Sequence, residues 1–361
     1  MAARMVVVSR TAEANTALAT SLRAVGVDVI ALQGPVHALM LDDDSGVAER
    51  CAANDVVIHR KAPAWPLASN LLRSARPVRI GSAEHGVDVG GPSWVVIAGP
   101  CAVESPAQTA RITDAVVAAG AHALRGGAFK PRTSPYSFQG LGRAGLELLA
   151  AARSKTGRPV VTEVVSAADV DAVVAHADCL QIGARNMQNF ALLKAVGETR
   201  VPVLLKRGFG NTVDELLGSA EHIMAAGNDQ VILCERGIRT FEVSTRFTLD
   251  VAAIAWLKQR SNLPVIVDPS HAAGDPKMVA PLTLAGLAAG ADGIIVEVHD
   301  APHEAKSDGH QALDLAGFTA LLASMTAMAP AFGRTCLPQE LRFSDKPHSG
   351  FVLDARPLDR P

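Results

Sequence analysis

From Ser93 onward, short apolar runs alternate with helical stretches, and this alternation repeats along most of the remaining chain. Units of this kind imply parallel strands, because each helix returns the chain to the edge where the next strand begins. Eight consecutive units are typical of a closed (β/α)₈ barrel of about 250 residues. We predict strands at 94–98, 122–125, 159–163, 178–182, 202–206, 230–234, 264–268 and 293–297, with helices at about 106–119, 141–154, 167–175, 188–196, 212–225, 248–259, 277–289 and 314–327.

An open, doubly wound sheet is the alternative arrangement for repeated strand–helix units. Such sheets usually carry a glycine-rich phosphate-binding fingerprint directly after their first strand. The segment after the first expected strand reads AGPCAVES at 98–105, which is not that fingerprint. We therefore assign residues 93–330 to a (β/α)₈ barrel.

A second pattern occupies the beginning of the chain. Residues 1–62 read as β-α-β-β-α-β, with strands at 5–10, 27–32, 36–42 and 55–60 and helices at 11–26 and 45–54. This order is that of a small ferredoxin-like α+β domain. Such a domain binds a regulatory ligand or serves as a packing or oligomerisation appendage, and both readings stay open. Residues 63–92 are assigned to a linker with a hairpin, and 331–361 to a C-terminal tail.

The composition excludes several classes of protein. The 361 residues carry a formal net charge of −2, and no basic excess indicates a nucleic-acid partner. No uninterrupted apolar run reaches about 20 residues, so we expect no membrane span. The five cysteines form no CxxC pair, and their odd number does not suit a disulfide framework. A reducing, cytoplasmic location is the simpler expectation.

Candidate functional residues gather where the expected strands end. In a (β/α)₈ barrel, catalytic groups lie at these carboxyl ends and in the loops that follow. Each group alone has an ordinary reading, such as a solvated arginine or a small buried cysteine. Together they would surround one mouth: Cys101, Arg125, Lys130, Arg132, Glu163, Arg185, Lys206, Arg236, Asp268, His271, Glu297 and Asp308.

Two kinds of chemistry are represented in this set. A thiolate, an imidazole and two carboxylates, from Cys101, His271, Glu297 and Asp308, suit one divalent ion such as Mn²⁺, Fe²⁺, Co²⁺ or Zn²⁺. The arginines and lysines exceed what one phosphate needs, since guanidinium forks bind phosphate and carboxylate bidentately. They suggest two phosphorylated substrates, or a phosphate-carboxylate together with a phosphate.

Several segments at these strand ends resemble one enzyme family. They are IAGPCAVES (97–105), RGGAFKPRTSPYSFQGLG (125–142), QIGARNMQN (181–189), LLKRG (204–208), ILCERG (232–237), VDPSHAAG (267–274), and VEVH with KSDGHQAL (296–313). In this order they resemble 3-deoxy-arabino-heptulosonate 7-phosphate (DAHP) synthases over about residues 93–327. The N-terminal module resembles that of the type I-beta members with a ferredoxin-like regulatory domain.

The resemblance implies an activity and a role for each residue. DAHP synthases join phosphoenolpyruvate to erythrose 4-phosphate with water, the first step of the shikimate pathway to chorismate and the aromatic amino acids. The family's metal ligands match Cys101, His271, Glu297 and Asp308. Its substrate-binding positions match Arg125, Lys130, Arg132, Thr133, Ala184, Arg185, Lys206 and Arg236. Lys130 is the candidate proton donor, Glu163 the candidate for the attacking water, and Asp268 is expected near the aldose hydroxyls or the metal-bound water.

Within the family's chemistry, the alternative is a 3-deoxy-manno-octulosonate 8-phosphate synthase, which takes arabinose 5-phosphate. The segment 130–134 reads KPRTS, as in DAHP synthases, whereas the octulosonate enzymes have an Asn-Arg-Ser type of sequence. The Arg132–Thr133 pair is therefore expected to hold the phosphate of erythrose 4-phosphate. A non-catalytic amino-acid sensor and an enzyme of secondary metabolism with a modified aldose are further alternatives. The resemblance also implies feedback inhibition by an aromatic amino acid and a homo-oligomer, either a tetramer or a dimer.

Overall fold

The predicted barrel is confirmed in the structure, a computed structural model that describes residues 3–33, 36–130, 134 and 136–336. Eight parallel strands of the described chain close in the order β10-β11-β12-β13-β14-β7-β8-β9. They are β7 (Val95–Gly99), β8 (Ala123–Arg125), β9 (Val160–Glu163), β10 (Cys179–Ile182), β11 (Val203–Lys206), β12 (Val231–Glu235), β13 (Val265–Val267) and β14 (Gly293–Glu297). Each overlaps a strand expected from the sequence.

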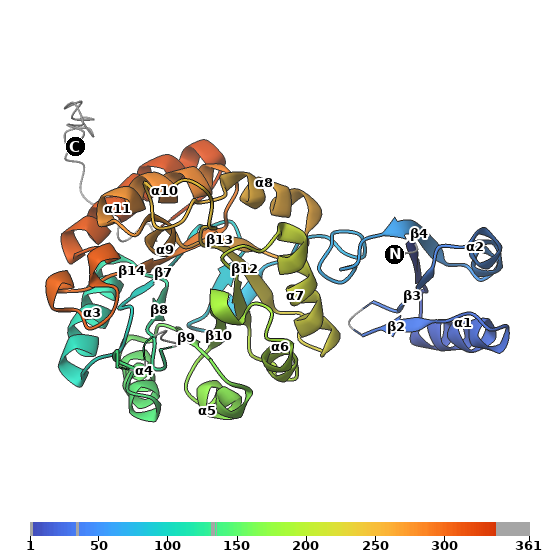
Figure 1. Cartoon of the computed structure of the whole chain (residues 1–361), viewed down its shortest axis with the longest axis horizontal. Coiled ribbons are helices and arrows are strands. Elements are labelled where there is room, and N and C mark those ends of the chain that lie inside the picture. Colours follow the sequence, from blue (N-terminus) through green and yellow to red (C-terminus); the bar gives the residue numbers. More distant parts are fainter. Residues whose placement is uncertain (1–2, 34–35, 131–133, 135, 337–361) are drawn as a thin grey trace.

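Helices surround this barrel (Figure 1). They are α3 (Pro106–Ala119), α4 (Arg143–Thr156), α5 (Val170–Val174), α6 (Phe190–Gly197), α7 (Val213–Ala225), α8 (Val251–Arg260), α10 (Pro276–Ala288) and α11 (Leu315–Met328). The expected third helix is shorter, because a 3₁₀ turn at Ala167–Asp169 precedes α5. A helix that the sequence did not indicate, α9 (Pro269–Ala273), follows β13; it is too short for an apolar period.

Apolar side chains fill both sides of the barrel wall. Alternate residues of β7 show the pattern: Val95 and Ile97 belong to the interior cluster, whereas Val96 and Ala98 pack with the surrounding helices. A strand with both faces buried reads as a continuous apolar run, which explains the sequence pattern. The interior is therefore packed, and the open space lies in the loops beyond the strands.

A hairpin covers one end of the barrel. Strands β5 (Val78–Ile80) and β6 (Val87–Val89) form an antiparallel pair, and their apolar side chains join the interior cluster. Gly81 and Gly90 approach Pro159 and Pro264, which precede β9 and β13. The hairpin therefore lies at the amino ends of the strands, opposite the end where barrel enzymes place their sites.

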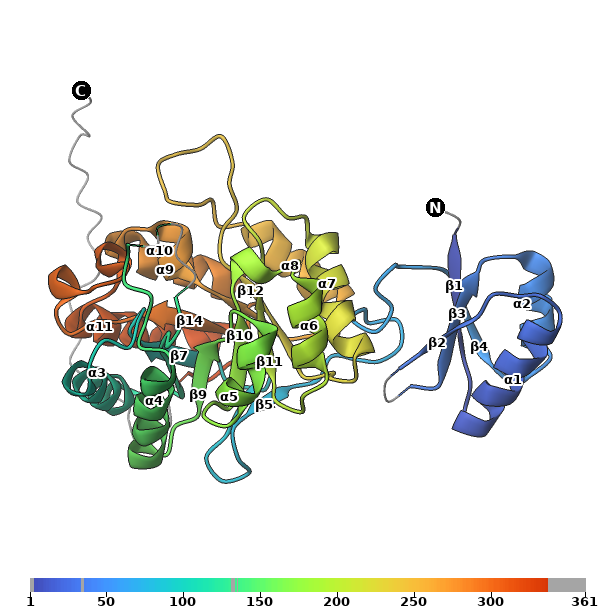
Figure 2. The same ribbon diagram turned by 60° about the horizontal axis from the view of Figure 1, so that its bottom comes forward.

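The N-terminal module has the ferredoxin-like order that the sequence predicted. Its elements are β1 (Arg4–Val8), α1 (Ala12–Ala24), β2 (Ile30–Leu32), β3 (Ala38–Asp42), α2 (Ser45–Ala52) and β4 (Val57–Ala62), and the antiparallel sheet has the order β2-β3-β1-β4. A separate apolar cluster, including Met5, Leu22 and Leu39, lies between sheet and helices. Figure 2 shows this module joined to the barrel by a single segment.

That joining segment is tied to helix α7. The backbone N–H groups of Leu67 and Ala68 donate to the Glu221 carboxylate over 3.0 and 2.9 Å. Burial raises the pKa of Glu221 to about 7, although the two N–H donors act in the opposite direction. The carboxyl group therefore titrates near neutral pH while it holds the joining segment on the barrel.

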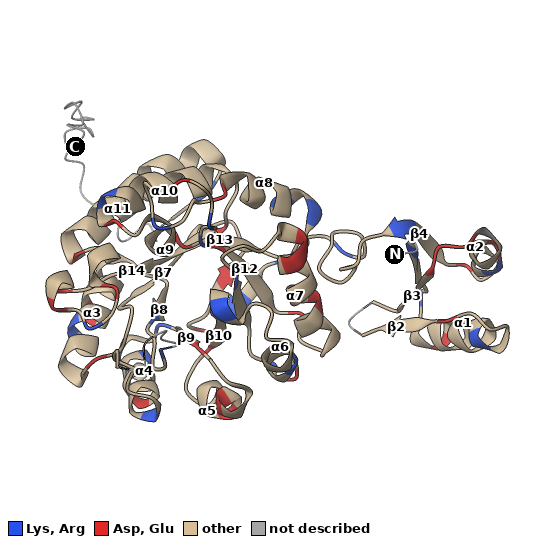
Figure 3. Cartoon of the chain, viewed as in Figure 1, with Lys and Arg blue, Asp and Glu red and all other residues tan. Residues whose placement is uncertain are grey.

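Charge and hydropathy add two observations. Acidic and basic residues are interspersed over the helices of both parts of the chain (Figure 3). The segment Leu315–Phe332 is long and apolar enough to cross a membrane, with a mean hydropathy of 1.5. It contains α11, which closes the ring of barrel helices and buries Phe318, Leu321 and Met325. As one of the helices packed around the barrel, it does not indicate a membrane protein.

Candidate active site

A polar pocket lies at the carboxyl ends of the barrel strands and brings together most of the residues expected there. Its lining comprises Arg125, Lys130, Glu163, Gln181, Gly183, Ala184, Arg185, Lys206, Phe209, Arg236, His271 and Asp308. These residues come from seven of the eight barrel strands and the loops after them, so the closed barrel is what makes them neighbours. Arg132 and Thr133 lie outside the described residues.

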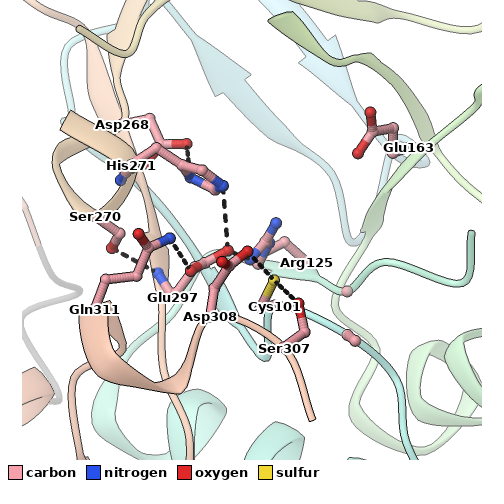
Figure 4. A network of polar contacts seen from close by, with 12 residues as sticks. Cys101, Arg125, Glu163, Asp268, Ser270, His271, Glu297, Ser307, Asp308 and Gln311 are labelled. Carbon is pink, nitrogen blue, oxygen red and sulfur yellow. Dashed lines mark hydrogen bonds and ion pairs between the residues drawn. The ribbon is translucent and has the colours of Figure 1, made fainter. Parts of the chain in front are cut away.

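Three of the four expected metal ligands are close together. One ligand atom each of Cys101, Glu297 and Asp308 lies within 4.8 Å of the other two. Two ligands that each lie about 2.0–2.3 Å from one ion are separated by less than this limit, so the trio can share an ion. His271 falls outside this trio, but its Nε2 faces Glu297 Oε1 at 3.5 Å. Figure 4 shows the four side chains converging.

Protonation in this cluster differs between sulfur and oxygen ligands. Burial, with the charge of Glu297, raises the pKa of the Cys101 thiol to about 11, although Lys130 Nζ lies 3.0 Å from its Sγ. Burial opposes ionisation of Glu297, but His271 and Arg125 outweigh it and lower the pKa of Glu297. Burial and the charge of Glu297 oppose ionisation of Asp308, but Arg246 and His271 outweigh them and lower its pKa too. The carboxylates of Glu297 and Asp308 are therefore charged at neutral pH, whereas the thiol must release a proton to bind a metal.

Asp268 holds His271 in place. Its Oδ1 accepts the His271 backbone N–H at the start of α9, and its Oδ2 lies 2.7 Å from His271 Nδ1. Lys206 forms an ion pair with the same Oδ2. Burial opposes ionisation of Asp268, but His271 and Lys206 hold its pKa well below the usual range. A carboxylate behind a histidine is the arrangement that fixes the ring of a metal ligand, so Asp268 orients His271 from behind the pocket.

Arg236 is the best candidate to receive an anion. Only 3% of its surface is exposed, and its guanidinium lies 4.2 Å from the ring centre of Phe247 and 5.1 Å from that of Phe209. Among the described residues, its Nη1 is buried without a hydrogen-bond partner. Burial lowers the pKa of Arg236 to about 10. A buried, incompletely satisfied cation favours a bound anion.

The remaining cations of the pocket differ in how far they are already paired. Arg125 Nη1 donates to Glu297 Oε1 over 2.7 Å, and Lys206 is paired with Asp268. Arg185 lies with its guanidinium 5.4 Å from the ring centre of Phe209. Arg185 and Arg236 therefore share an aromatic platform, which the sequence did not reveal, because Phe209 and Phe247 come from different loops.

Glu163 is separated from the metal ligands. It lies apart from Cys101 and Asp308 in Figure 4, although it lines the same pocket. Gln181 Nε2 donates to Glu163 Oε2 over 3.3 Å, and Gly183 leaves room for the carboxylate, since a Cβ there would lie 2.0 Å from Glu163 Oε1. Ser307, whose Oγ lies 3.0 Å from Cys101 Sγ, was not singled out from the sequence.

The fold and this pocket define a (β/α)₈-barrel enzyme whose site combines a set of cationic side chains with candidate metal ligands. Residues 77–331 match the DAHP synthetase I family. The chain belongs to this family, and the resemblance that the strand-end segments indicated is confirmed.

Individual relatives agree with this assignment. The chain is 46% identical over 287 residues to a phospho-2-dehydro-3-deoxyheptonate aldolase of Thermotoga maritima, covering 77% of this chain and 85% of the relative. It is 32% identical over 266 residues to a 2-dehydro-3-deoxyphosphooctonate aldolase of Koribacter versatilis, covering 68% and 94%. The crystal structure of a DAHP synthase from Thermotoga maritima matches with a TM-score of 0.74 and 41% identity, covering 92% of this chain and 99% of that one.

Proposed function

We propose that this chain is a DAHP synthase that condenses phosphoenolpyruvate with erythrose 4-phosphate. One observation carries the proposal: a cation-lined pocket adjoins a cluster of cysteine, glutamate and aspartate that could hold a metal. The relative with 46% identity, named phospho-2-dehydro-3-deoxyheptonate aldolase, supports the choice of reaction. In this reaction, C3 of phosphoenolpyruvate bonds to the aldehyde carbon, water adds at C2, and inorganic phosphate leaves.

The pocket side chains suit the charges of the first substrate. Arg185, Lys206 and Arg236 are proposed to bind the phosphate of phosphoenolpyruvate, with Arg236 supplying the least compensated charge. Arg125 and Lys206 are proposed to face its carboxylate, and Ala184 lines the same wall. Cations at these positions offset the repulsion between two anionic substrates and hold the reacting carbons together. Holding two reactants in the reacting geometry can lower the activation barrier by about 7–11 kcal/mol.

Cys101, His271, Glu297 and Asp308 are proposed to hold one divalent ion, with Mn²⁺ favoured and Fe²⁺, Co²⁺ or Zn²⁺ as alternatives. When bound there, such an ion supplies Lewis-acid polarisation of the aldehyde oxygen. Lys130 Nζ, which donates to Cys101 O over 2.6 Å, is placed to protonate an oxygen beside this cluster. Glu163 lines the same pocket, apart from these ligands, and is proposed to accept a proton from the attacking water.

An assay with two aldoses tests the reaction. The purified chain with Mn²⁺ is expected to consume phosphoenolpyruvate with erythrose 4-phosphate and not with arabinose 5-phosphate. The relative named 2-dehydro-3-deoxyphosphooctonate aldolase keeps the second aldose as the competing candidate. Turnover with arabinose 5-phosphate and not with erythrose 4-phosphate would overturn the proposal in favour of that reaction.

The biological setting follows from the proposed reaction. We place the enzyme in the cytoplasm, at the entry to the shikimate pathway, as a homo-oligomer. Residues 1–62 are proposed as a regulatory domain for an aromatic amino acid, with 63–92 as linker and hairpin, 93–330 as catalytic barrel and 331–361 as tail. Removing residues 1–62 should abolish inhibition by tyrosine or phenylalanine and spare catalysis; inhibition that persists would count against this role.

A further inference from the structure

The loop between β12 and α8 is attached to the short helix that carries His271. The loop closes on itself where Ile238 and Thr248 exchange backbone hydrogen bonds of 2.9 Å. Its returning arm donates from Arg246 N to Ala273 O and from Phe247 N to Ala272 O, over 3.1 and 2.9 Å. These bonds fix Arg246 beside α9, and therefore beside the candidate metal ligands.

The Arg246 side chain contacts one of these ligands directly and is linked to a second through Gln311. Its Nη1 lies 3.6 Å from Asp308 Oδ1 and donates to Gln311 Oε1 over 2.6 Å. Gln311 Nε2 in turn donates to Glu297 Oε2 over 2.6 Å, a contact visible in Figure 4. Gln311 is fully buried, so water does not compete for these bonds. One loop arginine is thus linked directly to Asp308 and through an amide to Glu297.

The amide of Gln311 restricts how the Glu297 carboxylate can rotate. The terminal torsion of a glutamate is broad, so a carboxylate held at one oxygen still has freedom to turn. Arg125 holds Oε1, and Gln311 holds Oε2. Each carboxylate oxygen has two lone pairs, so these bonds leave acceptor positions for a cation. Being neutral, Gln311 does not add to the positive charge that Arg125 places there.

Arg246 decides which way the Gln311 amide points. With Oε1 accepting from the guanidinium, Nε2 must face Glu297. The flipped amide would place its N–H₂ against the Arg246 donors and its carbonyl against the carboxylate, and both contacts are repulsive. The orientation of the donor to Glu297 therefore depends on the arginine.

We infer that Arg246 and Gln311 are positioning residues, which fix the carboxylates of Glu297 and Asp308 in a geometry that binds a divalent cation. This inference rests on the proposed metal-dependent function. Partners behind metal ligands typically change metal affinity by about 10–100-fold.

Co²⁺ binding tests this role without reference to catalysis. Equilibrium dialysis gives the dissociation constant of the full-length chain, and thiolate-to-cobalt absorption reports whether Cys101 is a ligand. Gln311→Met removes the amide and changes no charge, and should weaken Co²⁺ binding by about 10–100-fold. Arg246→Lys keeps the charge and loses the planar fork, and should weaken binding as well. The double variant should lose less than the product of the two factors, because the arginine acts partly through the amide.

Two matched variants serve as controls. Asn262→Leu removes another fully buried amide, which donates to Leu67 O over 2.7 Å near the amino end of β13. Arg239→Lys makes the same exchange in the same loop, at an exposed position beside Phe209. Both should bind Co²⁺ as the unaltered chain does.

The outcomes separate this inference from the proposed function. If the unaltered chain binds no Co²⁺, the proposed metal site is wrong, and the positioning role falls with it. If the unaltered chain binds Co²⁺ and both Gln311→Met and Arg246→Lys bind it equally well, the positioning role alone is overturned. Arg246→Lys decides the matter if Gln311→Met does not fold, since the arginine side chain is partly exposed.

Discussion

Replacing Arg236 with methionine should make the ligand-free enzyme more stable. Burial lowers the pKa of Arg236 from its ordinary 12.5 to about 10, so the charged form loses about 3 kcal/mol in the folded state. Contacts with Phe209 and Phe247 return about 0.5–2 kcal/mol each. A methionine avoids the charge and still packs between aromatic rings, a contact worth about 0.3–1.5 kcal/mol. Taken at the middle of these ranges, the balance favours the variant by about 1–2 kcal/mol.

Thermal unfolding at a fixed scan rate checks this balance. For a domain of about 250 residues, such as the barrel, 1 kcal/mol corresponds to about 2 °C, so the Tm of Arg236→Met should rise by roughly 2–4 °C in phosphate-free buffer. Phosphoenolpyruvate at 100 times its Kd should stabilise the unaltered chain by about 2.7 kcal/mol and the variant much less. The difference in Tm between the two proteins should therefore shrink or change sign when phosphoenolpyruvate is added.

Arg239→Met provides the matched control for this prediction. Arg239 also lies over the Phe209 ring, at 5.4 Å, but its side chain is exposed. An exposed charge has no burial cost to relieve, so this variant should gain no stability. A lower Tm for ligand-free Arg236→Met would refute the reasoning about the buried charge. Full stabilisation of Arg236→Met by phosphoenolpyruvate would show that the anion binds elsewhere.

Three further predictions concern the joining segment, the barrel wall and the metal ligands. The pKa of Glu221 is raised to about 7, so its contribution to stability is fully present below about pH 4.5 and lost as the pH rises through 7. As the pH rises from 5 to 8, the free energy of unfolding of the uncharged variant Glu221→Gln should therefore increase relative to that of the unaltered chain, by up to about 3 kcal/mol in urea unfolding. Parallel pH profiles of the two proteins would contradict the assigned titration. Arg207→Met should destabilise the fold by about 3–5 kcal/mol, because it leaves the buried Glu235 carboxylate, which Arg207 contacts at 2.9 Å, without this partner. The double variant Arg207→Met/Glu235→Met should recover part of this loss in the same urea assay. Cys101→Ala should lose more Mn²⁺ affinity in equilibrium dialysis than the 10–100-fold loss that outer partners cause, and unchanged affinity would remove Cys101 from the ligand set.

The sequence predicted the barrel because a parallel strand buried on both faces leaves an unmistakable apolar run. In a closed parallel barrel, the carboxyl ends of β8, β11 and β14 lie at the same end of the barrel. Arg125, Lys206 and Glu297, which end these strands, are therefore brought to that end. The order of strands in a closed barrel is thus enough to bring together residues that are far apart in the chain.

The parts that the sequence did not indicate depend on loop paths. Gln311 lies in a segment whose resemblance was clear, but its role needs Arg246, which comes from a different loop. Asp308 adopts a left-handed backbone conformation with φ of 49°, which no period in the sequence indicates. Phe209 and Phe247 stack with ring centres 5.2 Å apart only after β11 and β12 are adjacent. Long-range contacts of this kind are set by the tertiary structure.

The β5–β6 hairpin changes where the catalytic part of this protein begins. Its side chains Val78, Ile80 and Val89 cover interior residues contributed by all eight strands. A fragment that starts at Ser93, the boundary that the sequence suggested, would leave these inner side chains open to water and prone to aggregate. We expect a self-sufficient fragment to start ahead of Val78, which agrees with the family match from residue 77. The two ends of the barrel are therefore not equivalent: the hairpin closes the amino end, and the candidate active site lies at the carboxyl end.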